Sequence, residues 1–286
     1  MPVYSIVKRS HPPPAPRFID MSWRRHVSEV YGLFADVSGM RLHTILVTVL
    51  ALLLSTGIVP MAQAQNGASA TGCGEIAMRL PGDLVKVGRG LAMAPRNAIR
   101  PRNLRWELPV AAASGILISS VDLSASRRIQ SLPFQNDAIR GSNIGIGIEL
   151  GAAGLMYAIG CTGHRSSYAA NAGWTALEAM GAANGITLLL KSATNRQYAY
   201  KPGSRGEFWE GGKSFPSGHA ATSFAFASVI AHRYPNKRWL KWSAYGLATG
   251  VSLVRLAGKR HFPSDTLVGA TVGYITGTYL AKHTDE

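Results

Sequence analysis

The sequence predicts an all-α protein, a six-helix bundle with its active site at one end of a four-helix core. Six apolar stretches have the length of helices, and no segment shows the strict alternation that is typical of a half-buried strand. Only 16% of the 286 residues are charged, whereas 47% are hydrophobic. This composition excludes collagenous, coiled-coil and disulfide-rich classes and is typical of helical proteins of a membrane or cell envelope.

The six helix-compatible segments are residues 106–121, 142–161, 172–191, 219–233, 239–257 and 263–281. The links at 234–238 and 258–262 are short, so the helices on either side of each link are expected to be antiparallel neighbours. This order brings the end of 172–191 to the same end of the bundle as the starts of 219–233 and 263–281.

The remaining segments are expected to be connections around a helical domain at 106–281. Residues 65–105 form a basic lead-in whose prolines argue against a long helix. Residues 122–141 form a polar connector, and residues 192–218 form a long loop rich in Gly, Lys and Arg. Loops of that length inside a compact domain are usually functional or disordered.

The charge is strongly basic, with 30 Lys and Arg against 15 Asp and Glu, a net charge of +15. The cations are scattered between apolar segments rather than gathered in one arm, so no nucleic-acid partner is expected. An anionic membrane surface is the expected macromolecular partner. Whether the domain spans a membrane stays open, because Glu149 and Glu178 interrupt apolar stretches that seldom reach ~20 residues.

The N-terminal part has the pattern of a secretory signal peptide. A positive flank at Arg41, an uncharged apolar core and a small-x-small triplet follow one another, so residues 40–64 are expected to be the signal peptide. Residues 1–39 are then a non-native or disordered extension, with Met40 as the true start. A long n-region or an uncleaved anchor is the alternative. The protein is expected to be exported, as a periplasmic or membrane-associated protein of the cell envelope.

Cys73 and Cys161 are the two cysteines of the chain. An oxidising compartment permits them to pair. The sequence alone leaves open whether they lie close enough to do so.

Residues suited to phosphate binding fall at the end of the bundle that the topology defines. Residues 216–219 open a helix, with Ser217 as its N-cap and Gly218 allowing the backbone to approach a ligand closely. A helix N-terminus offers free N–H groups to an anion. Lys191 and Arg255 end their helices, where cations suit the helix dipole and can grip phosphate oxygens.

Two histidines and an aspartate complete this group. His261 and Asp265 stand four residues apart at the start of the last helix. Asp265 can therefore accept a hydrogen bond from one imidazole nitrogen and leave the other free as a nucleophile. His219 is placed to act as the general acid for a leaving oxygen. No metal site is expected.

These residues resemble the signatures of the type-2 phosphatidic acid phosphatase superfamily, which shares its fold with vanadium haloperoxidases and bacterial class A acid phosphatases. The signatures are K-x6-R-P, P-S-G-H and S-R-x5-H-x3-D. The second stands intact at 216–219. The third matches from Arg255 through His261 to Asp265, with Val254 in place of its leading Ser.

The first signature departs from the family pattern. Lys191 is present, but Tyr198-Ala199 stand where the family has Arg-Pro. One missing charge-assisted bond to phosphate costs ~1.5–3 kcal/mol. Arg196 is the favoured substitute for the missing cation, and the alternatives are Lys201 and Arg205.

The resemblance implies a role for each matching residue. His261 would form a phosphohistidine, oriented by Asp265, and His219 would protonate the leaving group. The residues that would hold the phosphoryl oxygens are Lys191, Ser217, Gly218, Arg255 and, as the substitute, Arg196.

The sequence therefore predicts a metal-independent phosphatase, similar to acid phosphatases and phosphatidic acid phosphatases. Its expected substrate is a phosphomonoester or pyrophosphate, with a lipid favoured. No cofactor is expected, and vanadate is expected to inhibit as a mimic of the phosphoryl transition state. Two alternatives stay open: a phospholipid-binding envelope protein that is weakly active or inactive because of Tyr198, and a vanadate-dependent haloperoxidase.

Overall fold

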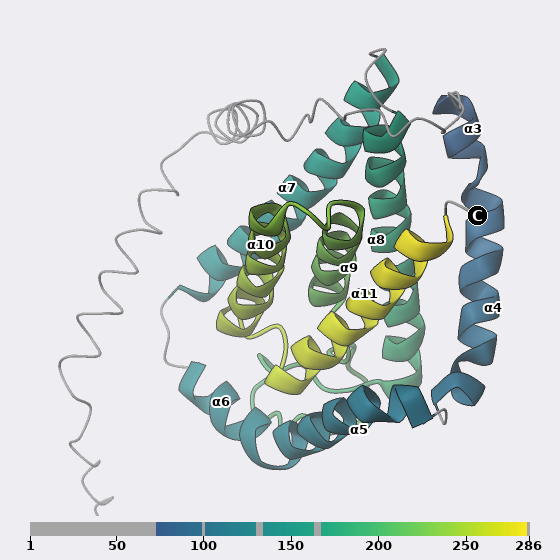
Figure 1. Cartoon of the computed structure of the whole chain (residues 1–286). Helices are drawn as coiled ribbons and strands as arrows, with labels where there is room; N and C mark the ends of the chain where they lie inside the picture. Colours follow the sequence, from purple (N-terminus) through teal and green to yellow (C-terminus); the bar gives the residue numbers. More distant parts are fainter. Residues whose placement is uncertain (1–72, 99–100, 130–133, 163–166, 285–286) are drawn as a thin grey trace, which may run out of the picture. The chain divides into compact units, whose positions relative to one another are not determined.

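The structure is a computed structural model that describes residues 73–98, 101–129, 134–162 and 167–284. The expected signal peptide (40–64), the expected extension (1–39) and the first residues of the lead-in lie outside the described residues. Within those ranges every regular element is a helix, which confirms the all-α class (Figure 1).

The described elements are α3 (Cys73–Met78), α4 (Leu80–Ala98), α5 (Pro101–Ile116), the π-helix η1 (Leu117–Val121), α6 (Asp122–Ile129), α7 (Gln135–Thr162), α8 (Ser167–Thr194), α9 (Gly218–Arg233), α10 (Arg238–Ala257) and α11 (Pro263–His283). The six predicted helices are confirmed as α5 with η1, followed by α7 to α11. The ends of α8 to α11 differ from the predicted ends by a few residues, and α7 begins a full two turns early.

Two segments that were predicted to be connections are helical. The lead-in contains α4, and Pro81 stands in the first turn of this helix. The N–H groups of a first turn have no partner within the helix, so proline is tolerated there. The polar connector contains α6 and the first turns of α7. Asp122 opens α6 and is buried rather than solvated, so part of this connector belongs to the interior of the protein.

Helix α9 lies at the centre of the bundle and contacts α7, α8, α10 and α11 (Figure 1). The buried core residues come from α7, α8, α9, α10 and α11. Helix α11 approaches α9 closely because Gly269 and Gly273 have no side chain. A Cβ at either position would overlap the carbonyl oxygen of Ser217 or Ala221. This approach joins the first turns of the two helices, where the Ser217 N–H donates to the Asp265 carbonyl at 2.8 Å.

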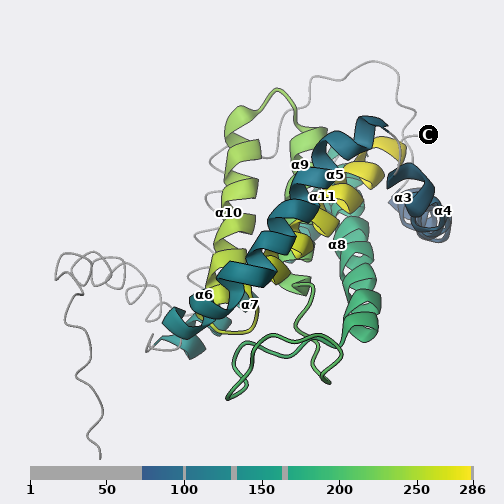
Figure 2. The same ribbon diagram turned by 90° about the horizontal axis from the view of Figure 1, so that it is seen from below.

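The predicted reversals of the chain are confirmed. Short links follow α9 and α10, so the end of α8, the start of α9, the end of α10 and the start of α11 lie at one end of the bundle. The long loop between α8 and α9 lies at that same end (Figure 2). The topology thus brings together the segments that carry the predicted site residues.

A disulfide joins α3 to α7. Cys73 and Cys161 are bonded, with their Cα atoms 5.7 Å apart, which answers the question that the sequence left open.

Two helical segments among the described residues, Leu108–Ile129 and Gln135–Cys161, are long and apolar enough to cross a membrane. Most of each segment is not buried within the protein.

Candidate active site

The imidazole of His261 is held by its Nδ1 atom. Nδ1 lies 2.8 Å from the backbone oxygen of Ser214 and 3.7 Å from Oδ2 of Asp265. A carbonyl oxygen only accepts hydrogen bonds, so Nδ1 carries the hydrogen and Nε2 keeps its lone pair. This is the tautomer that a nucleophilic histidine needs. The ring is buried, with 5% exposed.

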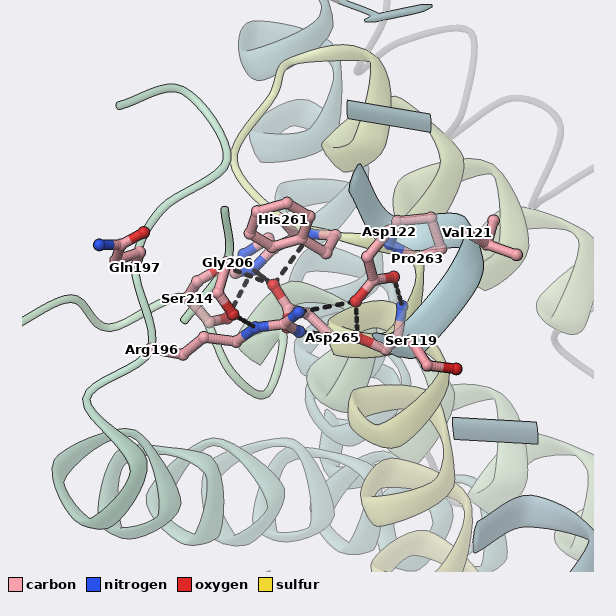
Figure 3. Close-up of polar contacts among 12 residues, drawn as sticks. Ser119, Val121, Asp122, Arg196, Gln197, Gly206, Ser214, His261, Pro263 and Asp265 are labelled. Carbon is pink, nitrogen blue, oxygen red and sulfur yellow. Dashed lines mark hydrogen bonds and ion pairs between the residues drawn. The ribbon is translucent and has the colours of Figure 1, made fainter. Parts of the chain in front are cut away.

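Asp265 is fixed more firmly than a simple His–Asp pair requires. Its Oδ2 accepts the backbone N–H of Phe262 at 2.9 Å and also the hydroxyl of Ser214 (Figure 3). Burial raises the pKa of Asp265, but the interaction with His261 and the charge of Arg196 outweigh burial and hold that pKa below its ordinary value. The closest partner of the imidazole is therefore the Ser214 carbonyl, and Asp265 acts as a buried negative charge beside it.

Arg196 does not lie where a phosphate could reach it. Its guanidinium donates to Asp265 Oδ1 at 2.5 Å, to Asp122 Oδ2 at 2.7 Å and to the Gly206 carbonyl at 2.9 Å. The ring of Phe262 stacks on it at 4.5 Å, and only 1% of the residue is exposed. The prediction that Arg196 substitutes for the missing phosphate-binding arginine is therefore wrong, because protein groups occupy its donors and cover its face.

Asp122 is a site residue that the sequence analysis missed. Its Oδ1 accepts the backbone N–H of Ser264 at 3.0 Å, and its Oδ2 accepts both the Ser264 hydroxyl and Arg196 (Figure 3). The signal available in the sequence was weak, a single aspartate directly after an apolar stretch, and such a residue usually starts a surface helix.

Helix α9 delivers His219 from its first turn. Ser217 caps the helix by accepting the N–H of Ala220, as predicted. His219 Nε2 lies 2.8 Å from Oδ1 of Asn143 on α7. The sequence analysis did not predict this hydrogen-bond partner. Burial, followed by the charges of Arg255, His261 and Lys191, lowers the pKa of His219 to about 4.

Gly218 stands where the backbone comes close to α8. A Cβ at this position would lie 3.0 Å from Oδ1 of Asn184. The missing side chain lets the first turn of α9 lie this close to α8, and a helix N-terminus is a favourable place for an anion.

Two cations face this helix start. Lys191 donates to the Lys213 carbonyl at 2.8 Å, and Arg255 donates to Ser142 Oγ at 3.2 Å. Burial lowers the pKa of Lys191 to about 8, an effect that Asp265 opposes and Arg255 reinforces. Burial and the charge of Arg260 lower the pKa of Arg255 to about 10. Buried cations that lie this close repel one another, and a bound anion would offset that repulsion. The group is therefore suited to bind an anion.

The model of the PAP2 superfamily matches residues 172–285. This range holds the intact second signature, the third with Val254 in place of Ser, and the first with Tyr198-Ala199 in place of Arg-Pro. The resemblance to the PAP2 superfamily thus extends over residues 172–285. The family resemblance seen in the sequence is thus confirmed.

Similar proteins include one curated relative and two solved structures. The chain is 38% identical over 65 residues to lipid A 1-phosphatase of Porphyromonas gingivalis, a match that covers 22% of this chain and 15% of that protein's length. It is similar to LpxE of Aquifex aeolicus with a TM-score of 0.43 and 21% identity, over 57% of this chain and 96% of that one. It is also similar to a transmembrane PAP2-type phosphatidylglycerolphosphate phosphatase of Bacillus subtilis with a TM-score of 0.46 and 19% identity, over 62% and 94% of the two chains.

Tyr198 marks where the matched region departs from the family pattern. Its ring stacks on Tyr200 with 5.0 Å between centroids, and the guanidinium of Arg260 lies 5.1 Å from the centre of the Tyr200 ring. Burial raises the pKa of Tyr198, while the charges of Arg260 and Arg255 oppose that rise. Arg260 therefore lies beside the position of the missing arginine, whereas Arg196 turns away from it.

Within the described residues, no three His, Cys, Asp or Glu side chains are grouped as they would be around a metal ion. The matched region gathers His261, His219 and Asp265 with the cations Lys191 and Arg255. The sequence predicted these residues together with Ser217, Gly218 and Arg196, and their roles stay predictions except that of Arg196, whose donors are bound by protein groups.

Proposed function

We propose that the protein is a phosphatase that hydrolyses a phosphomonoester or pyrophosphate of a lipid through a phosphohistidine intermediate. One observation carries the proposal. The Nδ1–H of His261 donates to the Ser214 carbonyl, which leaves the lone pair of Nε2 for attack on phosphorus. Two cations and the start of α9 lie beside this histidine. The lipid substrate is supported by the relative whose name is lipid A 1-phosphatase.

In the first step, His261 Nε2 forms a bond to phosphorus while the bond from phosphorus to the leaving oxygen breaks. His219 gives its proton to that oxygen. The pKa of His219 is about 4 without substrate, because burial and nearby cations disfavour its charged form. A bound phosphate brings negative charge to the same cations, and so it favours the protonated His219 that this step uses.

In the second step, a water molecule attacks phosphorus and the P–N bond breaks. Neutral His219 takes the proton of the water, and inorganic phosphate leaves. Lys191, Arg255 and the N–H groups at the start of α9 neutralise the charge that spreads over the phosphoryl oxygens in both steps. Each residue therefore returns to its starting protonation state.

We also propose that the protein is exported and associated with a membrane. The Cys73–Cys161 disulfide supports export, because disulfides persist in oxidising compartments. The exposed apolar segments Leu108–Ile129 and Gln135–Cys161 support membrane association.

A phospholipid-binding protein without turnover is the second candidate. The observation that favours it is Tyr198, which leaves the site one cation short of the family pattern. Binding of a phospholipid by well-folded protein, with no release of phosphate, would support this alternative.

The test is release of phosphate by the full chain from p-nitrophenyl phosphate and from a short-chain phosphatidic acid. Activity that resists EDTA, is blocked by vanadate and is lost in His261→Ala would support the phosphatase. His232→Ala is the matched control, because His232 caps its own helix by bonding the Ser228 carbonyl. Halide oxidation with vanadate and peroxide would indicate the haloperoxidase instead.

A further inference from the structure

Three buried charged residues form a chain of ion pairs that ends beside His261, the proposed nucleophile. Asp122, Arg196 and Asp265 expose 2%, 1% and 0% of their surface. The guanidinium of Arg196 bridges the two carboxylates, at 2.7 Å to Asp122 and 2.5 Å to Asp265 (Figure 3). Two negative charges thus share one positive charge, and one of the two lies 3.7 Å from His261 Nδ1.

Asp122 reaches this chain of ion pairs from outside the matched region. It opens α6, ahead of the matched residues 172–285. It also holds the first turn of α11 directly, by accepting the N–H and hydroxyl of Ser264. Ser264 stands next to Asp265, so Asp122 fixes this carboxylate both through Arg196 and through the backbone beside it.

We infer that Asp122 is a positioning residue of the proposed phosphatase site, acting through Arg196 to orient Asp265 and to set the proton affinity of His261. This inference rests on the proposed function, in which His261 Nε2 must be unprotonated to attack. Asp122 does not touch the substrate in this account.

Its effect on His261 follows from the charges. The titratable groups that face His261 are Asp265, which raises its pKa, Lys191 and Arg255, which lower it, and His219 on α9, which interacts with it electrostatically. Without the charge of Asp122, Arg196 is less neutralised, so the pKa of His261 falls. Without Arg196, two carboxylates stand uncompensated, and the pKa of His261 rises.

The experiment compares Asp122→Asn, Arg196→Gln and the double variant with the wild type. Asn keeps the shape of Asp122, and its amide oxygen can still accept the Ser264 N–H, but its amide nitrogen cannot accept from Arg196 or the Ser264 hydroxyl. The variant therefore removes the charge together with the ion pair to Arg196. The readouts are the acid limb of the pH profile of kcat/KM and the pKa of the His261 imidazole from an NMR titration. Asp137→Asn is the control, because Asp137 is an exposed carboxylate on α7.

The expected result is a pair of opposite shifts. Asp122→Asn moves the His261 titration to lower pH, Arg196→Gln moves it to higher pH, and the double variant lies between them. At its optimum pH, Asp122→Asn loses about tenfold in kcat/KM. The control profile coincides with that of the wild type.

The inference is overturned if activity falls while the His261 titration stays in place, or if both variants shift it in the same direction. If Arg196→Gln fails to fold, the direction of the shift in Asp122→Asn decides alone. The NMR titration needs no turnover, so a protein without phosphatase activity can still confirm or overturn the link from Asp122 to His261.

Discussion

Lys191 connects protonation to substrate binding at the level of a single residue. Burial lowers its pKa to about 8, and the ammonium is charged only below that pH. The part of the phosphate affinity that Lys191 contributes is therefore present at neutral pH and is lost as the pH rises through about 8.

We expect kcat/KM for a phosphomonoester to fall on this basic limb. Lys191→Arg should move the limb upward, because a guanidinium keeps its charge. An unchanged limb in Lys191→Arg would contradict the assignment. The pH profiles of the two proteins, measured side by side, make the comparison.

Arg260 is expected to supply part of the charge that Tyr198 does not. Arg260→Gln should lower kcat/KM by about one to two powers of ten, since a charge-assisted bond contributes ~1.5–3 kcal/mol. In a Tyr198→Arg background the same change should cost less, because the family arginine is restored. Arg238→Gln, an exposed change at the start of α10, far from the site end of that helix, is the control. Equal losses in both backgrounds would mean that Arg260 does not act at this position.

At the scale of elements, the site depends on the close approach of α9 and α11. Gly273→Ala should push the two helices apart, because its Cβ would overlap the Ala221 carbonyl. The expected cost is about 1–3 kcal/mol of unfolding free energy, with loss of activity as His219 moves relative to Asp265. Gly246→Ala on α10 meets nothing within 4 Å and should stabilise by about 0.5–1 kcal/mol.

Thermal unfolding of both variants, with a phosphate-release assay, tests this prediction. A Gly273→Ala protein as stable and active as the wild type would show that the helices do not need the glycine contact. Loss of stability in Gly246→Ala would point to a general intolerance of alanine rather than to this interface.

The helices of the core could be predicted because each is a long apolar stretch between polar links. The site could be predicted because short links force neighbouring helices to reverse, which joins Lys191, His219 and His261 at one end. Asp122 and the role of Arg196 could not be predicted. Both depend on how α6 packs behind α11, and a polar segment such as 122–141 looks the same whether its aspartate is solvated or buried.

Arg196 also shows how a sequence argument goes wrong. It stands two residues from the position of the missing arginine, but its side chain points into the interior toward Asp122 and Asp265. Arg260 is far from that position in sequence and close to it in space. Proximity along a loop is a poor guide to which cation reaches a shared anion.

At the scale of the whole described domain, the disulfide and the site lie at opposite ends of α7. Ser142 and Asn143, near its start, contact Arg255 and His219, whereas Cys161 is next to its last residue. The helix has 28 residues, which span ~42 Å at ~1.5 Å per residue. If the domain is exported whole, both ends share the oxidising compartment.

We therefore expect Ser192→Cys at the site end and Asn236→Cys at the other end to react with a membrane-impermeant maleimide in intact spheroplasts. Both positions are exposed. Labelling of one end alone would show that the domain spans the membrane and would contradict export of the whole domain. Labelling after lysis controls for the reactivity of each cysteine.

The central claim is that His261 carries the phosphoryl group, and trapping that group tests it most directly. The full chain would be mixed with a substrate labelled on its phosphate, quenched in alkali, where phosphohistidine survives, and digested for peptide analysis. The account predicts label on the peptide that contains His261, with none in His261→Ala and an unchanged amount in His232→Ala. Label on another residue, or full turnover in His261→Ala, would contradict it.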